Sequence, residues 1–237
     1  RHLPTARPHG APVSDHIKPQ PGPLDVAAVA LAVSDLDLAD LSARRWYAAG
    51  VGAPASARLA HAFALASDVV LALVDVDTGQ PGQRIDRYVI PFVHRDGVVR
   101  EAADGDGAWR ALAAAIAGGR TIPAMTRDGT STAPGTSSGQ VDAALVCRPS
   151  PGFADVWEGA ADEVGSAVET RLGGDGANTL AVIGDRVLLK TYRRVEAGLN
   201  PDLELTAYLF EEAGFTGVPR LAGWAEAVTR DGDIATV

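Results

Sequence analysis

The sequence predicts an α+β fold in which short antiparallel strands outnumber helices. Three strand-like runs, at residues 57–66, 68–77 and 84–94, follow one another with short turns between them, as in an antiparallel sheet. A further hairpin over residues 178–192 is followed by a helix that begins near residue 200. We find no internal repeat, so a repeat architecture is not expected.

The composition is that of an ordinary globular chain. The 237 residues are 46% apolar and 22% charged, and no apolar run is long enough to cross a bilayer. The net charge of −9 argues against a nucleic-acid surface and against a basic membrane-binding face. The single cysteine, Cys147, cannot form a disulfide within the chain, which fits a cytoplasmic protein. Its apolar neighbours favour an inert core thiol over a nucleophile.

The N-terminal quarter of the chain combines a leader with helical signals. Residues 1–23 contain six prolines and no helical period, so we expect a flexible leader. Residues 24–33 are rich in Ala and Val and fit a strand or a helix. A Ser cap and apolar positions on one side predict a helix from Ser34 to Tyr47, ended by nearby glycines.

The three strand-like runs come next, followed by an Ala-rich helix. That helix is predicted over 107–117, where a Gly-Gly pair stops it. Residues 127–139 are rich in Gly, Ser and Thr and form the clearest flexible segment. Strands are then expected at 140–148 and 166–172, and an apolar strand-like segment at 218–228 closes the chain.

The stretch from Asn178 to Phe215 carries the candidate site. Two apolar runs flank Gly184-Asp185, a two-residue hairpin signal with Gly at the first central position. The second run ends on Lys190. An Asn cap followed by Pro then predicts a helix that begins at residues 200–201.

Lys190 is unusual in this chain. Of the 21 Lys and Arg residues, only Lys18 and Lys190 are lysines, and Lys190 alone lies in an apolar strand. Phosphotransferases hold ATP phosphates with a strand lysine that is paired with a glutamate on the next helix, and Glu204 is placed for that pairing. The plain alternative is a solvated lysine on an edge strand, with Glu204, or better Asp202, complementing the helix dipole.

The loop over residues 171–179 joins two predicted strands and contains three glycines. Glycines allow backbone N–H groups to approach a phosphate closely. The spacing matches neither the dinucleotide fingerprint nor a Walker A loop. The loop is therefore either a phosphate cradle or an ordinary turn.

The segment from Gly174 to Trp224 resembles the maltokinase-like sugar kinases of actinobacteria, relatives of the aminoglycoside phosphotransferases in the protein-kinase-like superfamily. The motifs that carry this resemblance are Asn178-Thr179, Gly184-Asp185, Val187-Leu-Leu-Lys190, Tyr192-Arg-Arg194, Gly198-Leu-Asn-Pro-Asp-Leu-Glu204 and Val218-Pro-Arg-Leu-Ala-Gly-Trp224. Upstream, Ala43-Arg-Arg-Trp-Tyr47 and Tyr88-Val-Ile-Pro-Phe92 resemble the N-terminal cap domain of that family.

The resemblance implies an antiparallel-sheet cap domain at 24–125, a flexible linker at 126–139 and a kinase-like upper lobe at 140–237. That lobe would consist of an antiparallel sheet and one helix of the αC type. In the family, the catalytic Asp, the Mg²⁺ ligands and the sugar-binding residues belong to a C-terminal helical lobe, which is absent from these residues. We therefore expect no catalytic and no metal-binding residue in this chain, and no turnover by these 237 residues alone.

The implied reaction is ATP-dependent phosphorylation of a sugar hydroxyl with Mg²⁺, converting maltose to maltose 1-phosphate. Lys190 would hold the ATP phosphates, Glu204 would pair with it, and Asn178 and Thr179 would lie in the nucleotide-covering loop. The expected partners are ATP, a small sugar and an enzyme of the glucan pathway.

Two departures from the family pattern leave the sugar open. The lysine expected shortly after Tyr47 is absent, and the loop before Thr179 differs from the usual Gln-Ser-Asn-Thr. The alternatives are an actinobacterial glucosamine kinase, an aminoglycoside-type phosphotransferase and a non-catalytic binding module with the same fold.

Overall fold

The computed structural model describes residues 24–47, 53–79, 85–125, 142–157, 161–173, 176–230 and 234–237. The predicted leader (1–23) and the predicted linker (126–139) lie outside the described residues. The helices are α1 (Val26–Ser34), α2 (Leu38–Ala43), α3 (Ala108–Ala117), α4 (Phe153–Val156), α5 (Ala161–Val164) and α6 (Pro201–Ala207), which continues as a π-helical turn, η1 (Tyr208–Glu212). The strands are β1 (Ser56–Ala66), β2 (Val69–Asp77), β3 (Ile85–Arg95), β4 (Val98–Glu101), β5 (Thr121–Pro123), β6 (Ala143–Pro149), β7 (Glu169–Leu172), β8 (Asn178–Ile183), β9 (Val187–Tyr192), β10 (Arg194–Val195), β11 (Gly223–Thr229) and β12 (Ile234–Thr236).

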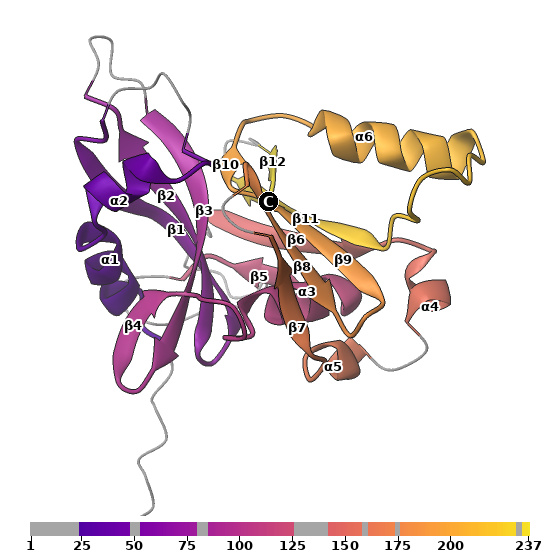
Figure 1. Cartoon of the computed structure of the whole chain (residues 1–237), viewed down its shortest axis with the longest axis horizontal. Coiled ribbons are helices and arrows are strands. Elements are labelled where there is room, and N and C mark those ends of the chain that lie inside the picture. Colours follow the sequence, from indigo (N-terminus) through magenta and orange to yellow (C-terminus); the bar gives the residue numbers. More distant parts are fainter. Residues whose placement is uncertain are drawn as a thin grey trace, which may run out of the picture.

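The described residues form three antiparallel sheets, in agreement with the α+β prediction (Figure 1). The first has the order β1-β2-β3-β10, with β4 also paired to β3, and the second has the order β12-β11-β6-β5. The third is the short sheet β7-β8-β9. Figure 1 shows α1 and α2 on the outer side of the first sheet and α3 between the sheets, while α6 projects beyond them.

Two hydrophobic clusters lie on the two faces of the first sheet. The outer cluster packs α1, α2, Trp46 and Tyr47 against one face of β2 and β3. The inner cluster packs the other face against α3 and against residues of the second and third sheets. Because β2 is covered on both sides, eight of its nine residues are buried.

The predicted cap and the predicted upper lobe share this inner cluster. β5, from the first stretch, pairs with β6 of the second, and β10 pairs with β3. The division at residues 125 and 140 stays a prediction, and the two stretches bury apolar surface against each other.

One predicted helix is wrong. The chain from Ser34 to Tyr47 does not form one helix, because α1 already ends at Ser34 and α2 covers only residues 38–43. Asp37 caps α2 by accepting from the backbone N–H groups of Ala39 and Asp40, whereas the Ser34 hydroxyl donates to the carbonyl of Leu31. The ambiguous run at 24–33 is helical. After α2 the chain turns and packs Trp46 and Tyr47 against Tyr88, with ring centroids 5.3 and 5.7 Å apart.

The hairpin predicted at Gly184-Asp185 is present, but its loop has three residues, 184–186, and not the predicted two, because Ile183 pairs across with Val187. Both residues have positive φ, 59° for Gly184 and 56° for Asp185, and Arg186 N–H donates to the carbonyl of Ile183. Positive φ at both central positions corresponds to a type I′ turn. A Cβ on Gly184 would also lie 2.8 Å from the Trp157 ring, so both conformation and packing require glycine.

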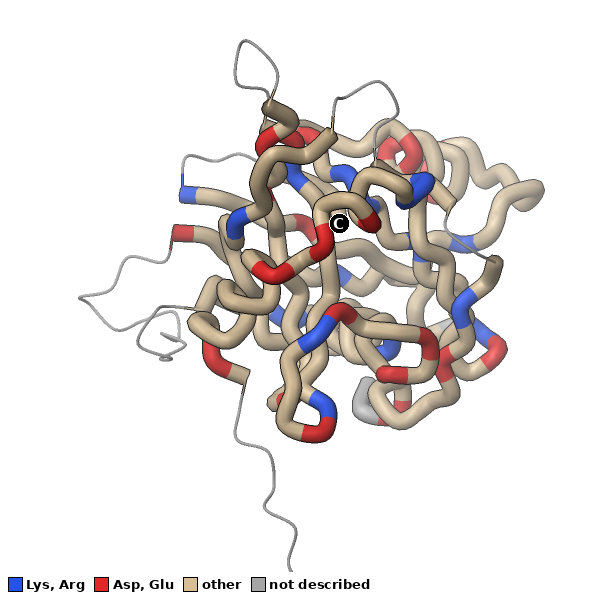
Figure 2. The backbone as a smooth tube through the Cα atoms, turned by 60° about the vertical axis from the view of Figure 1, so that its left-hand side comes forward, with Lys and Arg blue, Asp and Glu red and all other residues tan. Residues whose placement is uncertain are grey.

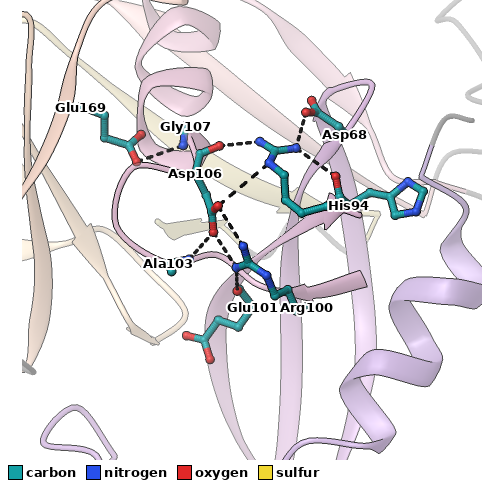
Figure 3. Close-up of polar contacts among 9 residues, drawn as sticks. Asp68, His94, Arg100, Glu101, Ala103, Asp106, Gly107 and Glu169 are labelled. Carbon is teal, nitrogen blue, oxygen red and sulfur yellow. Dashed lines mark hydrogen bonds and ion pairs between the residues drawn. The ribbon is translucent and has the colours of Figure 1, made fainter. Parts of the chain in front are cut away.

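Glu169 joins the third sheet to α3 (Figure 3). Gly107, which precedes α3, has no side chain to cap the helix, and the Glu169 carboxylate accepts instead from the N–H groups of Gly107 (3.1 Å) and Arg110 (2.8 Å). Beside it, Asp106 accepts from Arg100 at 2.6 Å and fixes the loop before the helix. A carboxylate from a distant strand therefore satisfies the first turn of α3.

We expect Glu169→Ala to lower the free energy of unfolding by about 1–2 kcal/mol, the usual cost of losing a helix cap. Urea unfolding followed by circular dichroism measures it. Glu163→Ala, at an exposed position of α5, is the matched control and should leave the midpoint nearly unchanged. Equal midpoints for the two variants would show that Glu169 does not cap α3 energetically.

Charges of both signs are interspersed along the described backbone, with no large one-sign region in the view of Figure 2. No helix among the described residues is long and apolar enough to cross a membrane.

Candidate functional site

Lys190 lies on β9, the edge strand of the third sheet. Its cross-strand neighbour on β8 is Leu180, and the pair Asn178 and Tyr192 follows on the same face. On the opposite face Thr179 and Thr191 are buried, whereas Val187 and Leu189 are partly buried. The two faces of this hairpin therefore differ in exposure, and Lys190 lies on the more exposed face.

Lys190 is held by the first turn of α6. Its Nζ donates to Oδ2 of Asp202 at 2.5 Å and lies 4.8 Å from the centroid of the Tyr192 ring. The Tyr192 hydroxyl donates to the same carboxylate oxygen at 3.3 Å. Asn200 caps the helix by accepting from Asp202 N–H, as predicted, so the cap fixes the residue that holds Lys190.

The predicted ion pair between Lys190 and Glu204 is wrong. Among the described residues Lys190 pairs with Asp202, and no ion pair joins it to Glu204. The reason is helical geometry, since Asp202 and Glu204 are two residues apart and point to different sides of α6.

The two other predicted site residues lie on opposite faces of β8. Asn178 shares the face of Lys190 and pairs across the strands with Tyr192. Thr179 faces the interior, is 5% exposed, and its Oγ1 accepts from Nε of Arg193 at 2.8 Å. Thr179 is therefore engaged inside the fold, and only Asn178 is placed beside Lys190.

Lys190 is one of the residues that line a cavity of about 640 Å³. β9, the inner side of α6, and the segment 218–225 form its walls, together with Phe153 and Val156. Most of the lining is apolar, and Lys190, Tyr192 and Asp202 supply polar groups on one side. An apolar cavity with a few convergent polar groups is the usual form of a small-molecule site.

The charge of this cavity is opposite to that of the whole chain. Arg186, Lys190 and Arg220 line it, and Asp202 is the one acid among the described lining residues. The chain carries a net charge of −9, so this local cationic excess is a distinct feature. It favours an anionic ligand.

Sequence reasoning assigned Asp202 to the helix dipole and gave no role to Arg186 or Arg220. The sequence did indicate the capped start of this helix. Asp202 could therefore have been found from its position in the first turn after that cap. Arg220 is reached only through tertiary structure, because it lies 30 residues beyond Lys190 in the chain. No local pattern indicates that Arg220 and Lys190 line the same cavity.

The ion pair changes the ionisation of both partners. The hydrogen bond from Lys190 lowers the pKa of the Asp202 carboxyl below its ordinary value, and the charge of Lys190 adds to this. Partial burial lowers the pKa of Lys190, but the hydrogen bond and charge of Asp202 outweigh it and raise the pKa above its ordinary value. Lys190 is therefore an ammonium at neutral pH.

We expect the Asp202 carboxyl to titrate below an ordinary aspartate in an NMR pH titration of the carboxyl carbons. Because the folded-state pKa is depressed, the contribution of the pair is present above the unfolded-state pKa and is lost as pH falls through the depressed value. Lys190→Met should return the midpoint toward the ordinary value. An unchanged midpoint in that variant would show that Lys190 does not hold Asp202 in solution.

Arg193 anchors the hairpin from behind. Its side chain is 2% exposed, and it donates to Thr179 on β8, to the carbonyl of Val89 on β3 and toward Glu101 on β4. Glu101 is also held by Arg44 at 2.5 Å, and both guanidiniums lie 5.4 Å from the Trp46 ring. Arg193, three residues after Lys190, thereby fixes the strand that carries Lys190 to the first sheet.

No protein-family model matches the chain, and no curated protein matches it. Solved structures do. A glucosamine kinase in complex with glucosamine, ADP and inorganic phosphate matches with a TM-score of 0.52 and 18% identity over 87% of this chain and 39% of that chain. Another glucosamine kinase structure, crystal form A, matches with a TM-score of 0.52 and 20% identity over 87% of this chain and 40% of that chain.

The chain has the fold of part of a sugar kinase. It spans about two fifths of the length of the glucosamine kinase chains it matches. The mixed fold with antiparallel sheets agrees with the predicted class.

The described residues contain no cluster of three or more His, Cys, Asp or Glu side chains that could hold a metal ion. Asp202, the acid of the cavity, is already engaged by Lys190. These described residues do not fit a Mg²⁺ site.

Proposed function

We propose that this chain is the ATP-binding part of a sugar kinase, with Lys190 holding the phosphates. The observation that carries the proposal is the Lys190–Asp202 pair on the wall of a cationic cavity within a kinase-like fold. A strand lysine positioned by an acid on the following helix is the arrangement by which kinases hold ATP phosphates. Here the positioning acid is Asp202.

The face that carries Lys190 also offers apolar surface. Leu188, which is 55% exposed, pairs across the strands with Val182, and Leu180 lies opposite Lys190. These side chains suit the flat face of a nucleobase, since large apolar side chains left open beside a charged group gain stability from being covered. A nucleotide would place its base on them and its phosphates toward the ammonium.

The residues of this chain would act by positioning and charge. Lys190 neutralises phosphate charge, Asp202 and Tyr192 hold its ammonium in place, and Arg186 and Arg220 add positive potential. Transfer of a phosphoryl group depends mainly on such positioning and charge neutralisation. Asn178, next to Tyr192 at the end of the glycine-containing loop, would contact the nucleotide from β8, whereas Thr179 would act only by holding Arg193.

The acceptor is proposed to be a sugar hydroxyl. One of the matched glucosamine kinases was solved in complex with glucosamine, ADP and inorganic phosphate, which supports a nucleotide and a sugar as substrates of the whole protein. Glucosamine has that support, while maltose rests on the sequence resemblance alone. The cap and upper-lobe division, Mg²⁺, a cytoplasmic location and a glucan-pathway partner belong to the same proposal.

Isothermal titration of the folded chain with a non-hydrolysable ATP analogue tests the proposal. We expect saturable binding at one site per chain. Glucosamine and maltose should then be compared as acceptors in the whole protein, by ADP release. If circular dichroism shows that the chain is folded and the titration still shows no saturable nucleotide binding, the ATP assignment is contradicted.

A further inference from the structure

A second cavity, of about 470 Å³, lies away from Lys190, between the first sheet and the second. One wall is a row of three residues on adjacent strands: Arg58 on β1 is paired across to Asp75 on β2, which is paired across to Arg87 on β3. The same sheet face carries Leu73 and Val89 of the inner cluster two residues further along. The apolar core therefore gives way to an ionic row at this end.

The ionic row is built around one buried carboxylate. Asp75 is 3% exposed, and Arg87 donates to it from Nε at 2.7 Å and from Nη2 at 3.3 Å. Arg58 donates to the same carboxylate from Nη2 at 2.8 Å, while its side chain is 66% exposed. One acid thus orients two guanidiniums and leaves an excess of one positive charge.

The cavity stays unfilled because the side chains of its opposite wall are short. Ala227 and Thr229 on β11 and Ala235 on β12 face the row with short side chains. The hydroxyl oxygen of Thr229 is buried and has no hydrogen-bond partner among the described residues. A buried hydroxyl without a partner is costly, so a ligand that reaches it would be favoured.

The remaining charges lie on the β10 side. Arg194 donates to Asp86 at 3.0 Å and lies 3.3 Å from Glu196, and all three residues line the cavity. The lining as a whole thus holds three arginines and three acids, and its positive excess is confined to Arg58 and Arg87. The cavity is polarised from one side to the other.

We propose that this cavity binds a small organic phosphate, with its phosphate group on Arg58 and Arg87. A guanidinium has five N–H donors, and Asp75 occupies only some of those on each arginine, so the others are available to phosphate oxygens. The volume exceeds that of a bare phosphate and falls in the range of small-molecule sites. The body of the ligand would reach the Thr229 hydroxyl and the Arg194 side, which suits hydroxyl or amino groups.

This assignment does not depend on ATP binding at Lys190, and the test separates the two. All titrations use the chain with the Lys190→Met substitution, so that phosphate binding at Lys190 does not contribute to the measured heat. The probes are inorganic phosphate, glucosamine 6-phosphate and glucosamine, each followed by isothermal titration calorimetry. We expect the sugar phosphate to bind more tightly than inorganic phosphate and glucosamine to give no saturable signal.

Two variants test the two walls. Arg58→Gln removes a phosphate donor at an exposed position and should weaken sugar-phosphate binding at least about tenfold, as expected for a lost charge-assisted hydrogen bond. Ala235→Leu fills the cavity without changing its charge and should abolish sugar-phosphate binding. Arg148→Gln is the control, because Arg148 pairs with Glu226 outside this cavity, and it should bind like the parent.

Circular dichroism and thermal unfolding verify that each variant is folded. The proposal would be overturned by the absence of saturable phosphate binding in the parent, or by unchanged affinity in folded Arg58→Gln or folded Ala235→Leu. Binding of inorganic phosphate without the sugar phosphate would likewise overturn the assignment to an organic phosphate.

Discussion

Replacing Lys190 by Met should weaken binding of an ATP analogue to the folded chain by about 10- to 100-fold. The substitution keeps the length and the apolar stem of the side chain but removes the ammonium. Hydrogen bonds to charged groups contribute about 1.5–3 kcal/mol, which corresponds to this range of affinity. Isothermal titration calorimetry of the two proteins under equal salt measures it, because the electrostatic part of binding is salt-dependent.

The two acids of α6 provide matched comparisons. Asp202→Asn should weaken binding less than Lys190→Met, since Lys190 keeps a polar neighbour but loses the charge that orients it. Glu204→Gln, on an exposed side of the same helix, should change the affinity by less than about twofold, as surface charges generally do. A loss in Glu204→Gln as large as that in Lys190→Met would restore Glu204 as the partner and contradict the role of Asp202.

Replacing Arg193 by Met should lower the free energy of unfolding by about 3–5 kcal/mol, the usual effect of removing one partner from a buried ionic network. The side chain is 2% exposed and contacts three elements, so its loss leaves the Thr179 hydroxyl and the Val89 carbonyl without this donor. Urea unfolding followed by tryptophan fluorescence measures the change, with Trp46 beside the substituted guanidinium as a local probe.

Arg193→Lys separates the charge from the shape of the guanidinium. It should be intermediate, because an ammonium cannot reach three acceptors in the fork geometry of arginine. Arg148→Met, with a side chain that is 53% exposed, is the surface control and should cost less than about 1 kcal/mol. An Arg193→Met protein as stable as this control would show that the network is not what joins the hairpin to the first sheet.

The elements predicted best were those whose local signals agree with their tertiary setting. The hairpin at Gly184-Asp185 has both a turn residue that tolerates positive φ and a packing neighbour that excludes a side chain. The start of α6 at Asn200 and Pro201 combines a capping side chain with a residue that needs no N–H. At these positions the local sequence signal and the tertiary packing favour the same residue.

The wrong or missing predictions have two causes, which are competing cap residues and contacts between residues far apart in the sequence. Ser34 and Asp37 are both good caps, and the sequence did not reveal that Asp37 would start the shorter helix. Lys190 was predicted as a site residue and stays a prediction. The acid that pairs with it depended on which side of α6 faces the sheet, and the helix buries none of its residues among those described. The Arg58–Asp75–Arg87 row required the register of three strands, which no local pattern contains.

The central claim is that Lys190 contacts the phosphates of ATP, and the scarcity of lysine makes it directly measurable. The chain has two lysines, Lys18 and Lys190. An acyl-phosphate derivative of ATP transfers its acyl group to a lysine amine beside the bound phosphates, and peptide mass spectrometry identifies the acylated residue. We predict acylation of Lys190 that excess ATP suppresses, with Lys18 as the internal reference for non-specific reaction. Equal acylation of both lysines, or acylation of Lys190 that ATP does not reduce, would contradict the account.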